Sequence, residues 1–221
     1  MKKIKYSEIT PEKIYKNRRS FIKSLGYGAS SLAVATIPFA SKAQADDRNE
    51  LTSFKDITTY NNYYEFGTSK SDPYVNSQNF KTSPWTISIE GEVEKPIKIS
   101  MEEITETFVS EERIYRLRCV EGWSMVIPWM GFSLSKLLSK VNPTNKAKYV
   151  EFESVYDPEQ MKGQRYPVLN WPYKEGLRID EAMHPLTTVV TGLYGKKLPN
   201  QNGAPLRIFI PWKYGFKSAK A

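Results

Sequence analysis

A single cysteine, Cys119, is the most reactive side chain in this sequence of 221 residues. With no second cysteine, an internal disulfide is excluded, which leaves a free reactive thiol, an intermolecular disulfide or a ligand to a soft metal. Arg116 and Arg118 precede it, and nearby guanidinium charge favours the thiolate, the form that attacks and binds metals. In a strand, however, both arginines would lie on the face opposite Cys119. A buried and inert thiol is the alternative.

The remaining sequence offers this thiol no metal-binding partners of its own. His184 is the sole histidine, and the chain contains no C-x-x-C, H-E-x-x-H or G-x-S-x-G pattern. These patterns mark zinc sites and the nucleophile of serine hydrolases, so neither class is favoured. We interpret His184 as a structural residue or as a support for a ligand. If Cys119 binds a metal, the other ligands must come from a cofactor.

Two segments have side chains suited to an anionic cofactor. Residues 61–67 combine amide, phenol and carboxylate groups in one short loop, and residues 202–207 join Asn202 and Gly203 to Arg207. Lysines at 213, 217 and 220 follow the second segment. Backbone amides beside a glycine and a nearby guanidinium suit a phosphate group. An ordinary Asn-Gly turn and a solvated row of lysines are the alternatives.

The first 45 residues are predicted to be a twin-arginine signal peptide. Arg18 and Arg19 begin the run Arg-Arg-Ser-Phe-Ile-Lys, a mildly apolar stretch covers 25–40, and Ala43-Gln44-Ala45 forms a cleavage site. The apolar stretch is too short and too rich in glycine and serine to span a membrane. We therefore expect a mature domain over 46–221, exported already folded to the periplasm. An ordinary secretory signal and a basic tail are the alternatives.

The leader also carries the excess positive charge. The chain has 32 basic and 24 acidic residues, of which the leader holds nine and two. The mature part, with 23 against 22, is nearly neutral. This balance argues against a nucleic-acid-binding surface or an anionic-membrane surface.

The mature part is predicted to be one α+β domain. Alternation of apolar and polar residues predicts strands at 85–91, 95–99, 114–120, 149–155 and 206–210. Ser100 and Glu103 form a capping box that starts a helix, a second short helix covers 134–141, and 179–183 form a helical turn. Residues 46–79 are polar, rich in tyrosine and without clear period, and are predicted to form an ordered arm.

Four stretches together, 59–67, 111–121, 180–186 and 201–217, resemble the periplasmic methionine sulfoxide reductase catalytic subunits (the MsrP family). The resemblance runs in order through nearly all of the mature chain. It implies an α+β, sulfite-oxidase-like molybdopterin-binding fold with one Mo-molybdopterin per chain. Members of the family continue beyond the last matching loop, so we expect the C-terminal part of the fold to be missing here.

The resemblance also assigns site residues. Cys119 would be the molybdenum ligand and the catalytic residue, and the cofactor would further contact Asn61, Tyr64, Glu65, Ser154, Asn202, Arg207, Ser218, Ala219 and Lys220. Ser154 stands where the family has threonine, which keeps a hydroxyl. Ser218-Ala219-Lys220 stands where the family has Gly-Ile-Lys, so the freedom of glycine is lost at Ser218. Glu121 is a candidate proton donor, or else a solvated carboxylate.

The implied reaction removes the oxygen of methionine sulfoxide, free or in oxidised periplasmic proteins, and gives methionine and water. Electrons would come from a membrane-embedded haem partner (MsrQ type) supplied by quinol. Sulfite oxidation on the same fold is the nearest rival, and it would need a strongly cationic pocket that draws on Arg116, Arg118 and Arg165. A cofactor-free exported binding module and an inactive truncated fragment are two further hypotheses.

Overall fold

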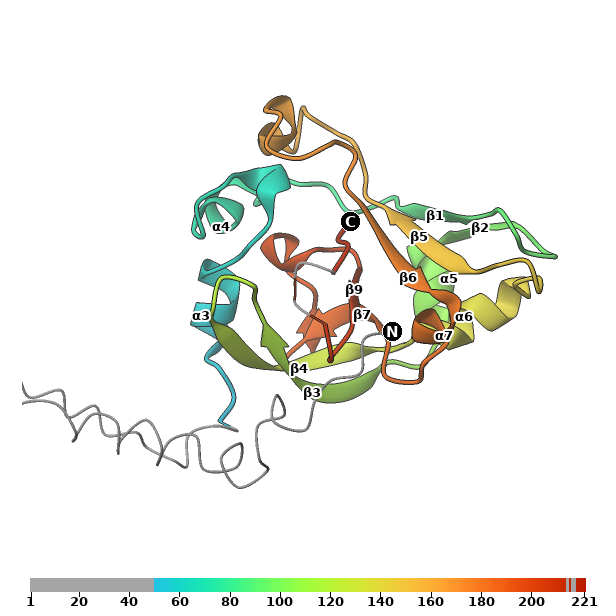
Figure 1. The fold of residues 1–221 in the computed structure, drawn as a ribbon. Coiled ribbons are helices and arrows are strands. Elements are labelled where there is room, and N and C mark those ends of the chain that lie inside the picture. The colour runs from blue at the N-terminus through green and yellow to red at the C-terminus, as the bar shows by residue number, and fades with distance from the viewer. Residues whose placement is uncertain (1–49, 214, 216–217) are drawn as a thin grey trace, which may run out of the picture. The chain divides into compact units, whose positions relative to one another are not determined.

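A five-stranded antiparallel sheet, seen in Figure 1, holds the segment around Cys119. Strand β7 lies at its centre, with β4 and then β3 on one side and both β8 and β9 on the other. The bounds are β3 (Glu111–Arg118), β4 (Ser124–Ser133), β7 (Thr188–Leu193), β8 (Lys196–Lys197) and β9 (Arg207–Phe209). The predicted strand at 114–120 is confirmed as part of β3, which ends one residue before Cys119.

Two further two-stranded antiparallel sheets lie together to one side of this sheet, at the right in Figure 1. They are formed by β1 (Thr86–Ile89) with β2 (Ile97–Ser100) and by β5 (Tyr149–Glu153) with β6 (Lys174–Arg178). The strands predicted at 85–91, 95–99, 149–155 and 206–210 are therefore confirmed in place, with ends that differ by at most two residues.

The predicted helices follow their sequence signals. Helix α5 (Met101–Thr107) begins at the capping box: Ser100 Oγ accepts from the Glu103 amide at 3.1 Å, and Glu103 Oε2 accepts from the Ser100 amide at 2.8 Å. Helix α6 (Leu134–Val141) buries its leucines and Val141 along one face. The helical turn predicted at 179–183 is α7 (Ile179–Ala182).

The arm before β1 contains regular structure that the sequence prediction did not assign. It holds α3 (Phe54–Thr59), the 3-10 helix η3 (Tyr64–Phe66) and α4 (Asp72–Asn76). None exceeds six residues, so no helical period of apolar residues can develop along the sequence. Tertiary packing stabilises them instead, since Ile57, Tyr63 and Phe66 are each 1% exposed.

This computed structural model describes residues 50–213, 215 and 218–221, so the expected leader and cleavage site lie outside the described residues. The contacts group 46–221 into one compact unit, and the domain boundary after Ala45 stays a prediction. Within the described ranges, no helix has both the length and the apolar character needed to cross a membrane.

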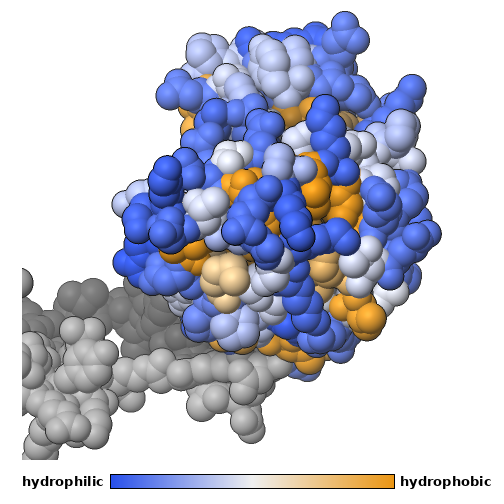
Figure 2. Space-filling model, turned by 90° about the vertical axis from the view of Figure 1, so that its right-hand side faces the viewer, coloured by the Kyte–Doolittle hydropathy of each residue, from blue (hydrophilic) through white to orange (hydrophobic). Residues whose placement is uncertain are grey.

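Three apolar clusters form the interior. One lies around α5 and α6, a second joins α3 to β4, β7 and β9, and a third packs Tyr63, Phe66, Phe80 and Met161 together. Apolar residues also reach the surface between hydrophilic ones, as Figure 2 shows on one face. The second and third clusters both include residues of the arm. Packing of these residues therefore holds the arm in place beside the site.

Close backbone contact joins the arm to the 3-10 helix η4 (Lys162–Arg165). A Cβ built on Gly163 would lie 2.0 Å from the carbonyl oxygen of Tyr64. We expect Gly163→Ala to lower the free energy of unfolding by about 2 kcal/mol or more, because one of the two backbones must move. Urea unfolding measures this loss. Gly176→Ala is the control, since its Cβ would meet nothing closer than 4.0 Å, and an equal loss in both variants would contradict the prediction.

Candidate functional site

Cys119 lies in the tight turn that joins β3 to β4. Its amide donates to the carbonyl of Trp123 at 2.9 Å, and the Gly122 amide donates back to the Cys119 carbonyl at 3.1 Å. Gly122 has a φ of 86°, which glycine adopts without strain. The turn therefore holds the thiol in a fixed place, where it is 5% exposed.

The arginines beside Cys119 do not face it. Leu117 and Cys119 are buried, whereas Arg118 and Val120 are exposed, so burial alternates as the sequence predicted. Arg116 donates instead to Ser124 Oγ at 3.3 Å. The polar group that reaches the thiol is the amide of Asn62, whose Nδ2 lies 3.9 Å from Sγ.

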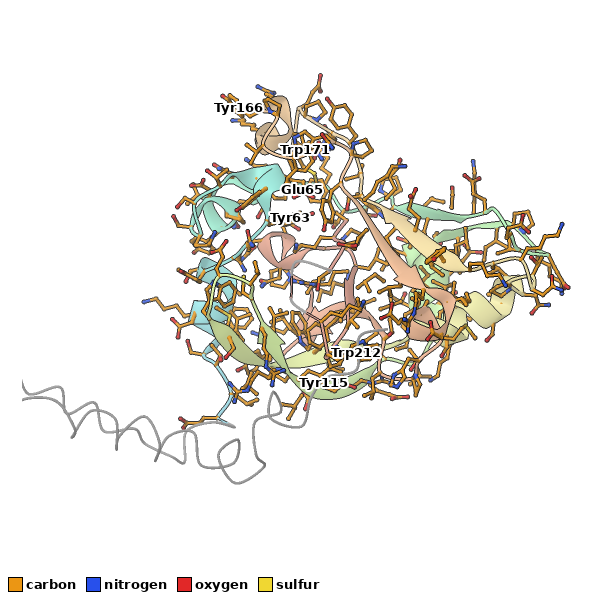
Figure 3. The ribbon with its side chains drawn as sticks, in the orientation of Figure 1. Tyr63, Glu65, Tyr115, Tyr166, Trp171 and Trp212 are labelled. Carbon is orange, nitrogen blue, oxygen red and sulfur yellow. The ribbon has the colours of Figure 1, made fainter. Side chains whose placement is uncertain are left out.

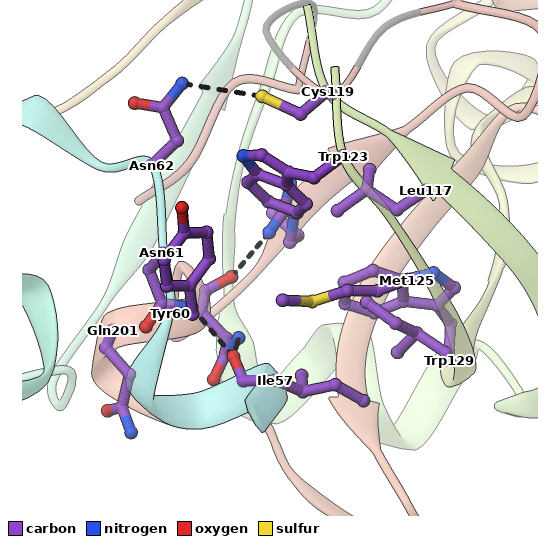
Figure 4. A pocket seen from close by; sticks show the side chains of 14 residues that line it. Ile57, Tyr60, Asn61, Asn62, Leu117, Cys119, Trp123, Met125, Trp129 and Gln201 are labelled. Atoms are coloured by element: carbon purple, nitrogen blue, oxygen red, sulfur yellow. Dashed lines mark hydrogen bonds between the residues drawn. The ribbon is translucent and has the colours of Figure 1, made fainter. Parts of the chain in front are cut away.

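A cavity of about 450 Å³ opens beside the thiol (Figure 4). It is lined by Ile57, Tyr60, Asn61, Asn62, Leu117, Cys119, Trp123, Met125, Ile127, Trp129, Gln201, Asn202, Arg207 and Gly215. A second cavity of about 350 Å³ is lined by Asn62, Tyr64, Glu65, Leu169, Tyr173 and Lys220. Asn62 borders both cavities, and its Nδ2 lies 3.9 Å from Cys119 Sγ, so this one side chain links the second cavity to the thiol.

Several polar atoms around these cavities are buried and have no hydrogen-bond partner in the part of the chain that the structure describes. Asn61 and Asn202 both donate through Nδ2 to the carbonyl of Ile57, at 2.8 and 3.0 Å, which leaves each Oδ1 unpaired. The Tyr63 hydroxyl, Ser154 Oγ and Arg207 Nε are likewise unpaired. Buried polar groups are nearly always hydrogen-bonded, so such a group of unpaired atoms indicates a polar ligand.

Arg207 places a cation under the first cavity. Its guanidinium lies 5.1 Å from the ring centroid of Trp129 and donates through Nη1 to the Asn202 carbonyl at 2.9 Å. Among the described residues no carboxylate lies within ion-pair distance of it. Burial lowers the pKa of Arg207 to about 10. A buried arginine without a carboxylate suits an anionic group of a ligand.

Lys220 and Glu65 both line the second cavity, and each charge acts on the pKa of the other. Burial, and then the charge of Arg207, lower the pKa of Lys220 to about 8, while Glu65 opposes this change. Burial likewise raises the pKa of Glu65, against the charge of Lys220. Lys220 Nζ also lies 4.9 Å from the ring centroid of Tyr63, which Figure 3 shows close to Glu65. Arg207 and Lys220 therefore both lie in buried surroundings that disfavour their charged forms.

Main-chain pairing brings the C-terminal segment to this region. The Ile208 amide donates to the Ala219 carbonyl at 2.9 Å, and Arg207 and Lys220 form an antiparallel bridge. The Val155 amide, next to Ser154, donates to the Ala221 carbonyl at 2.8 Å. Segments 154–155, 206–208 and 218–221, far apart in the sequence, thus lie side by side.

Comparisons with known proteins agree with this arrangement. Residues 74–221 match the family described as "Oxidoreductase molybdopterin binding domain". The protein-methionine-sulfoxide reductase catalytic subunit MsrP of Xanthomonas axonopodis pv. citri is 54% identical over 97% of this chain and 71% of its own length. The subunit of the same name from Burkholderia mallei is 51% identical over 97% of this chain and 70% of its own length. The chain belongs to the MsrP family of molybdopterin-binding oxidoreductases.

The fold has a distant structural relative. The sulfane dehydrogenase SoxCD of Paracoccus pantotrophus matches with a TM-score of 0.55 and 14% identity, over 87% of this chain and 57% of that one. At this identity the likeness shows the fold alone, which is the sulfite-oxidase-like molybdopterin-binding fold expected from the sequence.

The residues of this MsrP-family site fit the family's cofactor, Mo-molybdopterin. A thiol suits a soft metal, and the unpaired oxygens and amide groups suit the hydrogen-bonding edges of a pterin. Arg207 and Lys220 suit a phosphate. No three His, Cys, Asp or Glu side chains gather to hold a metal ion in the described ranges, so protein side chains other than Cys119 offer little coordination there.

The site residues expected from the sequence lie mostly in one region. Cys119, Asn61, Asn202 and Arg207 line the first cavity, while Tyr64, Glu65 and Lys220 line the second. Ser154, Ser218 and Ala219 are buried in the paired C-terminal region and line neither cavity. Their cofactor contacts stay predictions.

Glu121 and His184 have other contacts. Glu121 Oε1 lies 2.9 Å from Lys70 Nζ, an ion pair between the turn and the arm. His184 is exposed, accepts through Nδ1 from the Leu186 amide at 3.2 Å, and packs edge-on against Trp212. Of the two interpretations of His184, this geometry agrees with the structural one.

Sequence reasoning missed three residues at the site: Asn62, Tyr63 and Trp123. Asn62 contacts the thiol, Tyr63 has a buried and unpaired hydroxyl, and Trp123 has a buried and unpaired indole nitrogen. The signal for the first two was their place in the run 61–67, which was singled out as a whole. No sequence signal distinguished Trp123 from a core residue.

The lowered pKa of Lys220 predicts a pH dependence. In the cofactor-free fold Lys220 loses its proton near pH 8, whereas its ordinary pKa is 10.5. Protonated Lys220 therefore opposes folding below pH 8, and this penalty disappears as the pH rises to about 10.5. We expect wild type to gain unfolding free energy relative to Lys220→Met over this range, measured by urea unfolding. A constant difference from pH 7 to 10 would contradict the assignment.

Proposed function

We propose that this chain acts as a molybdenum-dependent reductase of methionine sulfoxide, free or in oxidised periplasmic proteins, and releases methionine and water. The observation that carries the proposal is the buried Cys119 thiol, which borders a cavity lined by buried polar atoms that have no partner among the described residues and by Arg207, a guanidinium without a carboxylate in that part of the chain. The names of relatives about half identical over nearly the whole chain support the substrate.

Each part of the site has a role in this proposal. Cys119 would hold the molybdenum. The pterin would form hydrogen bonds with Asn61, Asn202 and Ser154. Arg207 and Lys220 would bind its phosphate. Tyr64, Glu65 and the Ser218–Ala219 backbone would complete the enclosure. The bound cofactor supplies the two-electron redox chemistry of sulfoxide reduction.

The chain's own residues then control access and protons. The walls formed by Leu117, Met125 and Trp129 exclude bulk water from the thiol side of the first cavity. Removal of the sulfoxide oxygen as water consumes two protons. Glu121, which pairs with Lys70 in the turn and lines neither cavity, is the candidate proton donor of this proposal.

Sulfite oxidation has less support from the geometry. A small dianion needs several cations around the reacting centre, yet Arg118 is exposed and Arg165 donates to the Pro158 carbonyl at 2.7 Å. Arg207 is the one guanidinium that the first cavity includes within the described ranges.

Metal content and two rate assays test the proposal. We expect about one molybdenum per chain in the purified holoprotein, oxidation of a reduced viologen dye by methionine sulfoxide, and little reduction of ferricyanide by sulfite. Faster turnover of sulfite would favour the rival oxidase. Soluble protein without molybdenum, from cells that make the cofactor, would favour a binding module or an inactive fragment.

Export and the electron donor are part of the same proposal. The twin-arginine pattern supports delivery to the periplasm in the folded state, and a membrane haem subunit would supply electrons from quinol. Replacing Arg18 and Arg19 by lysine should leave the protein in the cytoplasm, as fractionation would show. Equal periplasmic yields would contradict the twin-arginine route.

A further inference from the structure

Trp123 carries an unused hydrogen-bond donor at the thiol. Its Nε1 is buried and has no hydrogen-bond partner among the residues that the structure describes, and Trp123 lines the same cavity as Cys119 and Asn62. In Figure 4 the nitrogen edge of the indole points toward the space between Asn62 and Cys119. An indole N–H can only donate, and no described residue accepts from it, so it is available to an acceptor on a ligand.

The position of the Trp123 ring is fixed from two sides. Its carbonyl accepts the Cys119 amide at 2.9 Å, which ties its backbone to the thiol-bearing residue. Its ring packs edge-on against Tyr60, with centroids 5.4 Å apart, and Tyr60 is 45% exposed. The pair forms an aromatic wall that leads from the surface to the thiol.

Trp129 has the same unpaired nitrogen but a different environment. It is fully buried and lies under the guanidinium of Arg207, among the apolar residues of the second cluster. Trp123 is only partly buried and adjoins the exposed Tyr60. Of the two indoles, Trp123 is therefore the one that a molecule entering from solvent can reach.

We propose that the Trp123 indole N–H, with the Asn62 amide, binds the sulfoxide oxygen of the substrate, while the Tyr60 ring lines the path of its alkyl chain. The inference rests on the proposed function. A sulfoxide oxygen is a strong acceptor with no proton to donate, so it complements two donors. Thioether and methyl groups also pack favourably against aromatic rings.

This arrangement distinguishes the substrate from the product. Methionine lacks the oxygen, so it gains no hydrogen bond from the Trp123 N–H, whereas the sulfoxide does. The product therefore binds more weakly than the substrate, which favours its release. The N–H therefore gives selectivity for the sulfoxide over the thioether, in addition to affinity.

Trp123→Phe tests the proposal in the holoenzyme, since it removes the N–H and keeps an aromatic ring. Titration calorimetry without an electron donor measures the binding of methionine sulfoxide and of methionine. We expect the dissociation constant of the sulfoxide to rise about tenfold and that of methionine to change less than about twofold. In turnover the KM for the sulfoxide should rise more than kcat falls, with unchanged molybdenum content.

Trp171→Phe is the matched control. Its indole donates to the Tyr166 carbonyl at 2.8 Å, and Figure 3 shows both residues in the loop between β5 and β6, away from Trp212 and Tyr115. This control should bind both compounds as wild type does.

Three results would overturn the inference. Equal weakening of sulfoxide and methionine binding would mean that only ring packing was lost. Loss of molybdenum from Trp123→Phe would assign the N–H to the cofactor. Unchanged sulfoxide binding would show that the N–H has no ligand role. In each case wild type still reduces methionine sulfoxide, whereas failure of the proposed function would show as wild type that binds or reduces none.

Discussion

Cys119→Ala is expected to lose both its molybdenum and its sulfoxide reductase activity, to below about one hundredth of wild type, while the protein stays folded. Loss of a group that only supports a metal ligand costs 10- to 100-fold in affinity, so loss of the ligand itself should cost at least as much. The substitution removes one sulfur atom from a side chain that makes no bond to another cysteine. Its effect on the free energy of unfolding should therefore be about 1 kcal/mol.

Three measurements separate this effect from damage to the turn. Elemental analysis gives the metal content, dye oxidation gives the activity, and urea unfolding gives the stability. Val120→Ala is the matched control, because Val120 adjoins Cys119 in the same turn and is 61% exposed. We expect this variant to keep its metal.

Cys119→Ser adds a test of the role of sulfur. A hydroxyl is a poor ligand for a soft metal, so the serine variant should resemble the alanine variant in metal content and activity. Full sulfoxide reductase activity in either variant would contradict the assignment of Cys119 as the catalytic metal ligand. Activity that survives with the metal lost would contradict the proposed mechanism.

The sequence predicted correctly those helices and strands whose formation depends on residues close to one another in the chain. The capping box of Ser100 and Glu103 fixed the start of α5, and the leucine spacing predicted α6. The period of two in β3 correctly placed Cys119 and Arg118 on opposite faces. Each of these features involves residues within a few positions of one another.

The longest strand, β4, was not predicted. Nearly all its residues are buried on both faces, because β3 and β7 flank it and apolar clusters cover it, so apolar and polar residues do not alternate. Pro128 in its middle also argues against a strand by sequence rules. Strand β7 was also not predicted, although four of its first five residues are β-branched. Its residues are buried on both faces as well, so apolar and polar residues do not alternate along it.

The site itself depends on contacts between distant segments. The Asn62 amide contacts a thiol that lies 57 positions away in the sequence. The main chains of Arg207 and Lys220 form an antiparallel bridge between β9 and the C-terminal segment. No periodicity encodes such contacts. The resemblance to a family supplied the candidate residues, whereas the unpaired state of Asn61, Asn202 and Arg207 required coordinates.

Arg207→Met is expected to change stability and cofactor binding in opposite directions. In the cofactor-free protein, the guanidinium is 5% exposed, its Nε has no partner, and burial lowers its pKa to about 10. A buried charge without a carboxylate opposes folding. We expect Arg207→Met to raise the unfolding free energy of the cofactor-free protein by about 1–3 kcal/mol, because the gain in desolvation exceeds the loss of the Asn202 hydrogen bond and the contact with Trp129.

The same variant should fail to retain the cofactor. Without the guanidinium, the anionic part of the ligand meets an apolar side chain, so molybdenum content should fall below about one tenth of wild type. Urea unfolding of protein made without molybdopterin synthesis measures the first effect. Elemental analysis of protein made with the pathway intact measures the second.

Arg113→Met supplies the matched contrast, because it makes the same chemical change at an arginine that has partners. Arg113 donates to the Pro185 carbonyl at 2.9 Å and to Thr188 Oγ1 at 3.2 Å, and it pairs with Glu111 at 3.3 Å. Its loss removes these three contacts and should destabilise the cofactor-free protein by about 1–2 kcal/mol. If the unfolding free energy rises in Arg207→Met and falls in Arg113→Met, then Arg207 serves a ligand and lowers the stability of the cofactor-free fold. Destabilisation in both would mean that Arg207 serves the fold itself.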